Sequence, residues 1–348
     1  MKHPHRALRA LALRLLATRL LAPRLLASQR LAPAACALAL AFTSAGAQAE
    51  DFPSKPVRLI LPFPAGTGVD ANAREIAAKM TPILGQTVII DNRPGAAGII
   101  GTEAAAKAVP DGYALYMGST STLGAQPFMY SKLPYNAERD FIPISLVGVL
   151  QTGMLAHPGV PANNARELIA LSKSRPDSLN VATQGIGTHS HLSGVWFALA
   201  SGADLKFVPY NTSSPFADLL AGQVQLMFDG LPAAAGNIKA GKLKLLGITG
   251  RARHPTFPDT PTFTEMGVPD YEPLAWLGIF APTGTPPAIV EKLGAAAQKG
   301  GKAPDLAEKW RSYGGELIGS SPAEFAVFIK SERVKWSSVI KRAHVKMD

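Results

Sequence analysis

The stretch VRLILPFPAGTGVD, residues 57–70, constrains the fold of this chain more than any other segment. Its first half is a continuous apolar run, which is typical of a strand buried on both faces of a parallel sheet. A short loop with proline and glycine follows, and apolar residues then recur at helical spacing from Ala71 to Met80. A strand, a glycine loop and a helix N-terminus together direct backbone N–H groups at one point, which suits an anion. An ordinary strand-to-helix turn has the same pattern, so this stretch alone leaves both readings open.

The same order of elements recurs along the chain. Strand patterns at 87–90, 113–117 and 179–183 alternate with helix patterns at 98–108 and 192–199, which predicts an α/β fold with parallel strands. The segment 179–199 repeats the opening design of strand, glycine loop and helix. Three helices are expected at the end of the chain, at 287–299, 305–313 and 322–343, the last opened by a capping box from Ser321 to Glu324.

The strand patterns also predict two lobes. A strand at 141–150 is followed almost at once by another apolar segment, so the first crossing between lobes is placed at 150–153. After the Pro-rich stretch 251–273, the apolar run 274–281 is expected to return to the first lobe. These boundaries predict one domain of residues 50–150 plus 275–348 and a second of residues 151–274. A ligand cleft is expected where the strands of both end.

The first 49 residues have the pattern of an export signal. Seven Lys and Arg residues precede the first acidic residue, Glu50, and the uncharged segment 31–42 has the length of a signal-peptide apolar region. Ala47-Gln48-Ala49 fits the small-x-small cleavage pattern, which predicts a cleaved signal peptide of residues 1–49. The basic region is unusually long, so the true start codon could lie further in. No Arg-Arg pair indicates twin-arginine export.

Other roles for the leader have less support. The twelve residues of its uncharged segment are too few to span about 30 Å of hydrocarbon as an anchor. Cys36, the one cysteine, stands in a poor context for lipid modification, and the mature chain would contain no thiol. The formal charge of +10 belongs mostly to the leader, because 28 of the 35 Lys and Arg follow it against 25 Asp and Glu. This balance argues against a nucleic-acid partner.

Enzyme signatures are missing from the sequence. The chain has no Gly-x-Ser-x-Gly elbow, no Gly-Lys-Ser/Thr phosphate loop and no Gly-x-Gly-x-x-Gly motif. His189 and His191 lie two residues apart, as metal ligands on a strand would, but no acidic cluster accompanies them. We therefore expect no catalytic residues, no metal and no cofactor. A secreted hydrolase whose Ser, His and Asp meet only in space stays as an alternative.

Four strand ends are rich in small and hydroxyl residues, at 64–68, 118–122, 185–188 and 228–230. Main-chain N–H groups and hydroxyls from both lobes should converge there, and such donors bind a carboxylate without Arg or Lys. Asp70 also fits a capping box with Thr67, so it has either a structural or a ligand role. Asp229, at a strand end, is the better candidate to contact a ligand amine or hydroxyl.

A series of short motifs runs through the chain after residue 51. They are Phe63-Pro64-Ala65-Gly66 with Asp70, Asn92-Arg93-Pro94-Gly95-Ala96-Ala97-Gly98 with Ile100-Gly101-Thr102, Pro110-Asp111-Gly112-Tyr113, Gly187-Thr188 with His191-Leu192, Asp218-Leu219-Leu220-Ala221-Gly222-Gln223, Met227-Phe228-Asp229 with Leu231-Pro232, and Ala281-Pro282 with Gly284-Thr285-Pro286-Pro287. In this order they resemble the solute receptors of the tripartite tricarboxylate transporter class, the Bug-type periplasmic binding proteins. The resemblance covers residues 52–348.

The resemblance implies a type II periplasmic-binding-protein fold, with two parallel-rich mixed sheets flanked by helices around a ligand cleft. Two loops close on the ligand, one after the first strand and one after the matching strand of the second domain. The resemblance also implies a small organic acid as ligand, membrane transporter subunits as partners, a periplasmic location and a monomer. The ligand-binding residues that it implies are Phe63, Ala65, Gly66, Thr67, Asp70, Ser119, Gly187, Thr188, His191 and Asp229.

Two departures from the family pattern bear on the ligand. Thr67 separates Gly66 from Gly68 where the family usually has adjacent glycines, and Asn211-Thr212 stands where it usually has Lys-Gly. The sequence therefore leaves the ligand open among di- and tricarboxylates, amino acids, aromatic acids and nicotinate-like compounds. A sensory receptor that binds the same ligand class and signals to a membrane sensor protein is the alternative function.

Overall fold

The computed structural model describes residues 52–210, 215–312 and 314–347. The described residues from Pro53 onward form one compact unit. The expected signal segment 1–49, its cleavage site after Ala49 and Cys36 lie outside the described residues. Within the described part of the chain, no helix combines the length and the apolar character that crossing a bilayer requires.

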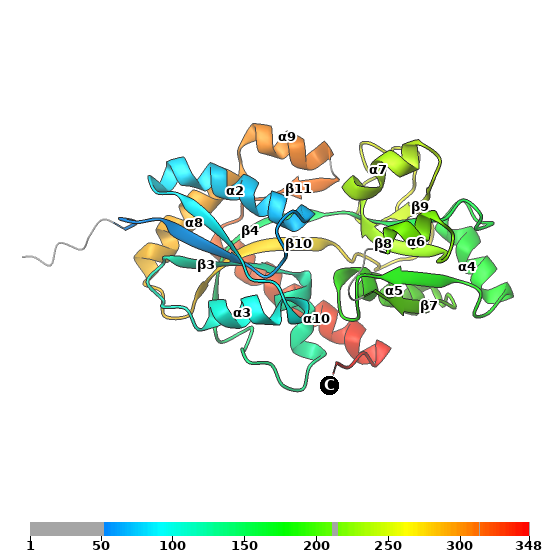
Figure 1. Cartoon of the computed structure of the whole chain (residues 1–348), viewed down its shortest axis with the longest axis horizontal. Coiled ribbons are helices and arrows are strands. Elements are labelled where there is room, and N and C mark those ends of the chain that lie inside the picture. Colours follow the sequence, from blue (N-terminus) through cyan, green and yellow to red (C-terminus); the bar gives the residue numbers. More distant parts are fainter. Residues whose placement is uncertain (1–51, 211–214, 313, 348) are drawn as a thin grey trace, which may run out of the picture. The chain divides into compact units, whose positions relative to one another are not determined.

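Two mixed sheets carry the fold. The strands of the first are Val57–Leu61 (β1), Val88–Asn92 (β2), Ala114–Ser119 (β3), Phe141–Leu150 (β4), Ala275–Pro282 (β10) and Gly315–Leu317 (β11). Among the described residues they form a six-stranded sheet in the order β11-β4-β10-β3-β1-β2 (Figure 1). β1 is parallel to β2 and β3, whereas β10 is antiparallel to β3 and β4.

The strands of the second sheet are Thr152–Ala156 (β5), Asn180–Thr183 (β6), Lys206–Pro209 (β7), Leu226–Gly230 (β8) and Lys244–Ile248 (β9). The order of these five described strands is β7-β6-β8-β5-β9. β6 is parallel to both neighbours, and β5 is antiparallel to both of its own. The expectation of an α/β fold with two mixed sheets is therefore confirmed.

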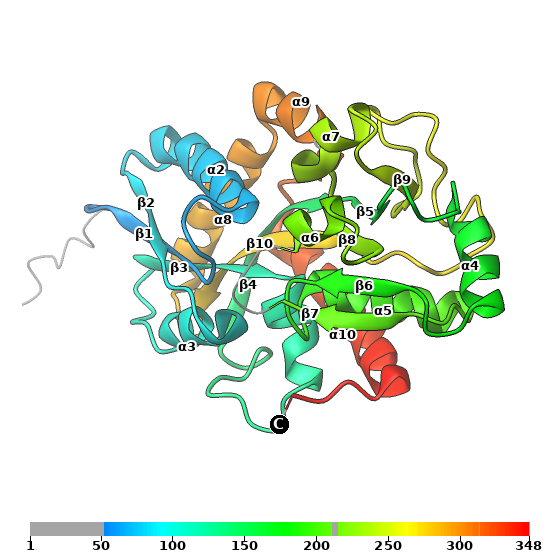
Figure 2. The same cartoon turned by 45° about the vertical axis from the view of Figure 1, so that its right-hand side comes forward.

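Helices flank both sheets (Figure 2). They are Gly68–Leu84 (α2), Ile99–Ala106 (α3), Ala165–Ser174 (α4), His189–Ser201 (α5), Phe216–Leu220 (α6), Leu231–Lys239 (α7), Pro287–Gly301 (α8), Pro304–Ser312 (α9) and Pro322–Ala343 (α10), with shorter helical turns at Ala96–Gly98 (η1), Thr120–Ala125 (η2) and Gln126–Phe128 (η3). The sequence did not predict α7, in which Pro232 and Gly236 weaken the helical pattern, nor β11, which has three residues. The N-cap of α6 is Pro215.

The strand pairing places the candidate loops at the carboxyl ends of neighbouring strands. β1 and β3 are parallel neighbours, so their carboxyl ends lie side by side in the first sheet. β6 and β8 are parallel neighbours too, so their carboxyl ends lie side by side in the second sheet. β3 and β8 pass directly into η2 and α7, whereas β1 and β6 lead through short loops, 62–67 and 184–188, into α2 and α5. Each sheet therefore presents two strand-to-helix turns side by side.

The chain passes from the first sheet to the second at a single residue, Gln151, between β4 and β5. The Gln151 side-chain amide donates to the carbonyl oxygens of Thr249 at 3.0 Å and Ala252 at 2.7 Å. Thr152 and Thr249 are also joined, because the Thr152 amide donates to the Thr249 hydroxyl at 2.8 Å and the Thr249 amide donates to the Thr152 carbonyl at 2.9 Å. The outgoing and returning segments therefore run side by side.

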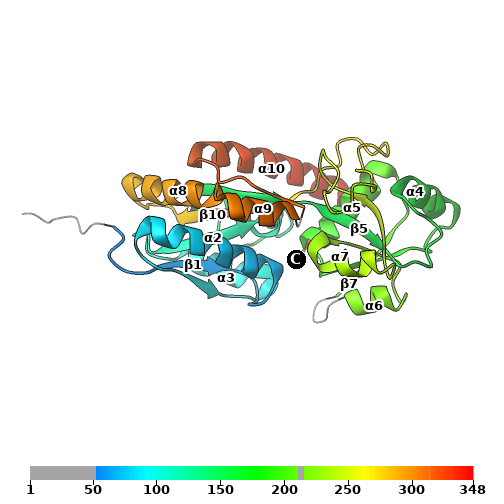
Figure 3. The same ribbon diagram turned by 90° about the horizontal axis from the view of Figure 1, so that it is seen from above.

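The helix α10 packs against both sheets' cores. It contacts β4 of the first sheet and α5 beside the second (Figure 3). Phe325 and Ile329 belong to the core of the first sheet, whereas Trp336 and Ile340 belong to the core that contains Met154. The helix has 22 residues, which is long enough for its two halves to pack into different cores.

The predicted capping box at the start of α10 is present. The Ser321 hydroxyl accepts from the Glu324 amide at 3.2 Å, and the Glu324 carboxylate accepts from the Ser321 amide at 2.8 Å. Replacing Ser321 by Ala is expected to lower the free energy of unfolding by about 1 kcal/mol, since one first-turn amide loses its partner. Urea denaturation at constant m-value measures the change. Ser338→Ala, on an exposed position of the same helix, is the control and should change little.

Candidate functional site

The hydroxyl of Thr67 shapes the loop after β1. It donates to the Pro64 carbonyl oxygen at 2.9 Å and accepts from the Asp70 amide at 3.3 Å, so Thr67 is the N-cap of α2. Gly66 has a φ of +81°, a left-handed conformation that glycine adopts without steric cost. The expected capping box is half present, because the Asp70 carboxylate accepts from the Gly66 amide and not from the Thr67 amide.

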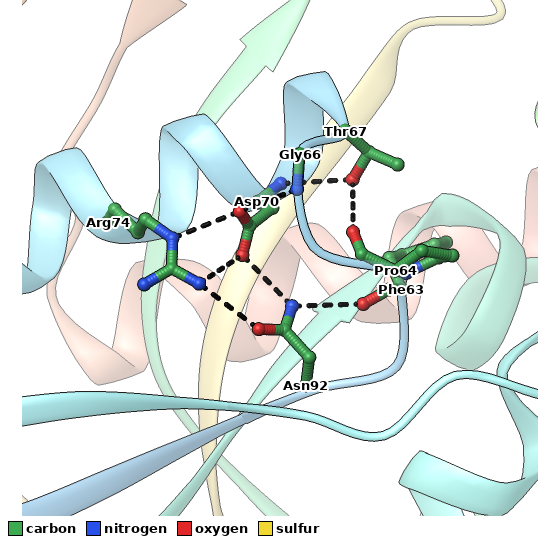
Figure 4. A network of polar contacts seen from close by, with 7 residues as sticks. All are labelled: Phe63, Pro64, Gly66, Thr67, Asp70, Arg74 and Asn92. Atoms are coloured by element: carbon green, nitrogen blue, oxygen red, sulfur yellow. Dashed lines mark hydrogen bonds and ion pairs between the residues drawn. The ribbon is translucent and has the colours of Figure 1, made fainter.

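Protein donors occupy both oxygens of the buried Asp70 carboxylate (Figure 4). Oδ2 accepts from the Gly66 amide and from Arg74 Nε, each at 3.0 Å. Oδ1 accepts from Arg74 Nη2 at 3.0 Å and from Asn92 Nδ2 at 2.9 Å, and Asn92 also donates to the Phe63 carbonyl. The bonds from Arg74, then Asn92 and Gly66, lower the pKa of Asp70 to about 2 against the effect of burial. Asp70 is thus ionised at neutral pH and ties the loop to the end of β2.

The loop after β6 repeats this design around Thr188. The Thr188 hydroxyl donates to the Gly185 carbonyl oxygen at 2.8 Å and accepts from the His191 amide at 3.4 Å. Gly187 has a φ of +80°, and its amide donates to His191 Nδ1 at 3.3 Å. Burial lowers the pKa of His191 to about 4, so the ring is neutral at neutral pH. The two loops therefore share three hydrogen bonds, from the threonine hydroxyl, to that hydroxyl and from the glycine amide, with a neutral histidine in place of the charged aspartate.

Each loop leaves the same kind of donor available. The third helical residue bonds back to the threonine, so the first two amides of each helix are left without an intrahelical partner. These are the amides of Gly68 and Val69 in α2 and of His189 and Ser190 in α5. A helix N-terminus carries a partial positive charge, and its amides bind carboxylate oxygens. The site is therefore suited to a small anion held by backbone groups.

A connecting segment packs against both loops. A Cβ placed on Gly98 would lie 2.9 Å from Thr122 Cγ2 and 3.3 Å from Pro62 Cβ, at the base of the first loop. A Cβ placed on Gly187, in the second loop, would lie 3.0 Å from Met129 Cε. The segment that runs from α3 through β3, η2 and η3 thus reaches from one loop to the other. The segment is therefore in contact with the base of the first loop through Thr122 and with the second loop through Met129.

Ser119 lies at the end of β3 with its hydroxyl engaged inside the protein. It is the N-cap of η2, where it accepts from the Thr122 amide at 3.4 Å, while its own amide donates to the Thr122 hydroxyl at 3.1 Å. Ser119 is 6% exposed. Ala65, at the tip of the first loop, is exposed. These two predicted residues therefore differ, one shaping the turn and the other facing outward.

Asp229, at the end of β8, accepts two hydrogen bonds. Oδ1 accepts from the adjacent Gly230 amide at 2.8 Å, and Oδ2 accepts from Gln184 Nε2 at 3.3 Å. No ion pair to Asp229 is found among the described residues. Burial raises its pKa to about 6, although the bonds from Gly230 and Gln184 lower it. Asp229 can therefore change its charge near neutral pH, unlike Asp70.

The two histidines of the second loop point to different partners. His189 Nε2 lies 2.9 Å from the Thr152 hydroxyl, and its ring meets Trp336 edge to face, with 6.3 Å between centroids. His191 instead bonds to Gly187 and packs against Phe207. In the described part of the chain, no group of three His, Cys, Asp or Glu residues could hold a metal ion.

Sequence reasoning missed three residues of this site: Arg74, Asn92 as a partner of Asp70, and Gln184. The spacing of Arg74 four residues after Asp70 on a helix is a signal that could have found it. The role of Asn92 depends on the parallel pairing of β2 with β1, which opposes Leu61 and Asn92. Gln184 reaches Asp229 because β6 and β8 are neighbours.

Residues 72–345 match the protein family described as the tripartite tricarboxylate transporter family receptor. A Pseudomonas sp. (strain P51) protein, described as the UPF0065 protein in the tcbD-tcbE intergenic region, is 39% identical over 88% of this chain and 92% of its own length. Protein BugT of Bordetella pertussis is 32% identical over 89% of this chain and 96% of its own.

Solved structures of similar proteins have the same fold. The periplasmic binding protein BugD is 35% identical, with a TM-score of 0.76 over 85% of this chain and 100% of its own. Rpa4515 of R. palustris, solved with adipate, is 32% identical, with a TM-score of 0.77 over 84% of this chain and 99% of its own. MatC of Rhodopseudomonas palustris, solved with malate, is 33% identical, with a TM-score of 0.74 over 83% of this chain and 100% of its own.

Proposed function

Because the chain belongs to the tripartite tricarboxylate transporter receptor family, a family of solute-binding proteins and not of enzymes, we propose that it captures a small carboxylate-bearing metabolite in the periplasm and delivers it to a membrane transporter of that type. The observation that carries the proposal is the pair of matching loops, 64–70 and 185–191, each with free amides at a helix N-terminus. The adipate and malate bound by two structural neighbours are ligands of this class.

The proposed receptor has two domains. Residues 50–150 plus 275–348 form the first and residues 151–274 form the second, each built on one of the two sheets. Gln151 and the paired segment at Thr249 make the joint on which the domains close. Closure brings one loop from each domain against the ligand. The receptor acts as a monomer, and residues 1–49 are removed on export after Ala49.

In this proposal the site residues have two kinds of role. Asp70 and His191 are positioning residues, since each holds the glycine amide that sets its loop. Asp229 contacts the ligand directly. The remaining groups supply backbone amides, hydroxyls and the walls of the site: Phe63, Ala65, Gly66, Thr67, Ser119, Gly187 and Thr188.

Thermal unfolding with a panel of organic acids tests the proposal. A ligand at about a hundred times its Kd should stabilise the protein by about 2.7 kcal/mol. The panel contains adipate, malate, an aromatic acid and an amino acid, each paired with its neutral amide as the control. At least one acid should raise the stability of the protein, and the neutral amide of that acid should not. Formation of a product from any panel member would contradict it in favour of the hydrolase.

The transport step needs a separate measurement. Deletion of the gene should abolish uptake of the ligand that the panel identifies, and re-expression should restore it. If uptake is intact and only ligand-dependent gene induction is lost, the sensory alternative replaces the transport proposal.

The charge of Asp229 predicts the pH dependence of binding. Its pKa is raised to about 6, so the carboxylate is negative above this pH and repels a dicarboxylate, while protonation below it removes the repulsion. Affinity for a dicarboxylate is expected to rise about tenfold as the pH falls through 6, equivalent to about 1.4 kcal/mol. Asp229→Asn should bind as the protonated form does at each pH. Titration calorimetry checks this, and an equal pH slope in the variant would contradict the role of Asp229.

A further inference from the structure

A pocket of about 520 Å³ lies behind the second loop, between α5, β7 and the segment that follows α10. Its volume is within the range of small-molecule sites. The wall is mainly apolar, and Ile186 at its rim is 42% exposed. Among the residues that line the pocket are Ile186, His191, Val195, Leu199, Phe207 and Lys346.

His191 gives this pocket one directed polar group. Its Nδ1 accepts from the Gly187 amide, so the neutral ring carries its proton on Nε2. The side chain is 8% exposed and lines the pocket, and among the described residues no hydrogen-bond acceptor is found for Nε2. An N–H donor on the wall of an open, mainly apolar pocket can bind an acceptor that enters.

The charges around the pocket favour an anionic acceptor. Lys346 lines the rim, and His344 lies beside it. Among the residues that the structure describes, no acidic side chain lines the pocket. The ring of Phe207 meets that of His191 edge to face, with centroids 5.5 Å apart, and fixes the imidazole plane.

We propose that this pocket binds an amphiphilic monocarboxylate, with its hydrocarbon part against Val195, Leu199 and Phe207. Its carboxylate accepts from His191 Nε2–H and lies near the Lys346 ammonium. The residues whose amides are assigned to the transported solute, Gly68, Val69, His189 and Ser190, do not line this pocket, although Ile186 and His191 of the second loop do. Its occupancy does not depend on the proposed function of the loops.

The His191 ring also connects the pocket with the second loop. Its Nδ1 accepts a hydrogen bond from the Gly187 amide, and Gly187 packs against Met129. The Met129 carbonyl in turn accepts from the Met347 amide at 3.0 Å, just beyond the pocket wall. An occupant of the pocket therefore contacts the elements that position the loop. This consequence, unlike the binding itself, depends on the proposed function.

Nitrogen NMR of the imidazoles, with sodium octanoate as the probe, tests the pocket. Octanoate should shift the His191 Nε2 resonance saturably, and it should do so also when the solute site is filled by the acid that the panel identifies. Ala198→Phe fills the pocket and should weaken octanoate binding at least tenfold. Ala200→Phe, on an exposed position of the same helix, is the matched control and should leave it within twofold.

A second variant covers the case in which Ala198→Phe does not fold. Lys346→Glu changes an exposed residue and should weaken octanoate several-fold, with little effect on octanol. The proposal is overturned if octanoate leaves the His191 resonance unmoved, if saturating solute displaces it, or if the folded variants bind octanoate as the wild type does. Failure of the solute panel with retained octanoate binding would instead reject the proposed function alone.

Discussion

The Asp70→Ala variant is expected to lose most of its affinity for the solute, at least tenfold, and about 2 to 3 kcal/mol of stability at pH 7. The carboxylate accepts four hydrogen bonds, two of them from Arg74 and one from the Gly66 amide. Charge-assisted bonds of this kind are stronger than neutral ones. Without them, Gly66 has no fixed position and the amides of α2 lose their common direction.

The acid dependence of the same variant checks its physical cause. The pKa of Asp70 is lowered from 3.8 to about 2, so its contribution to stability is full above pH 3.8 and is lost as the pH falls through 2. The stability difference between the wild type and Asp70→Ala should therefore shrink below pH 3.8. Asp91→Ala, which removes the surface ion pairs of Asp91 with Arg58 and Arg93 on the neighbouring strand, is the control and should cost about 1 kcal/mol or less. Unchanged solute binding in Asp70→Ala would contradict the positioning role.

The Trp336→Ala variant is expected to lose about 3 to 5 kcal/mol of stability. Trp336 is fully buried, and its ring packs edge to face on Trp196 with 5.4 Å between centroids. Its indole N–H donates to Glu332 Oε2, which also accepts from the Trp276 indole, each at 3.1 Å. Removing a large aromatic ring from a packed core leaves a cavity, which sets the size of the effect.

A conservative variant measures how much of the loss comes from the whole aromatic side chain. Trp336→Phe keeps a six-membered ring in the core and loses the N–H donor and the rest of the indole, so it should cost less than Trp336→Ala, about 1 to 2 kcal/mol. Urea denaturation gives both values. A loss below 1 kcal/mol in Trp336→Ala would mean that the second half of α10 only covers the surface, and that the helix does not join the two cores.

The sequence predicted most elements because their local signals agree with the tertiary structure. The helix α4 begins after Asn164 and ends at Ser174, as its cap and the following proline indicate, and α10 begins at its capping box. The short strand β11 has no local signal, since its place depends on antiparallel pairing with β4. Long elements with a clear periodicity can therefore be predicted from the sequence, whereas a short strand such as β11 is defined only by the strand with which it pairs.

The candidate site was predictable in outline and not in detail. The two glycine loops were expected to be alike, but the equivalence of Asp70 and His191 appears only when each bonds to the glycine four residues before it. Thr67, which differs from the family pattern, is a helix cap in the same position as Thr188. No spacing rule could show that the His191 ring faces a pocket behind α5, because β7 and the C-terminal segment complete that pocket.

Amide NMR of the wild-type protein shows whether one carboxylate binds both loops. A binding carboxylate should shift the amide resonances of Gly68 and Val69 together with those of His189 and Ser190, with one common Kd. The neutral amide of the same compound should shift none of them. Shifts confined to one loop, or absent from both while binding is saturated, would contradict the account of two matching loops on one carboxylate ligand.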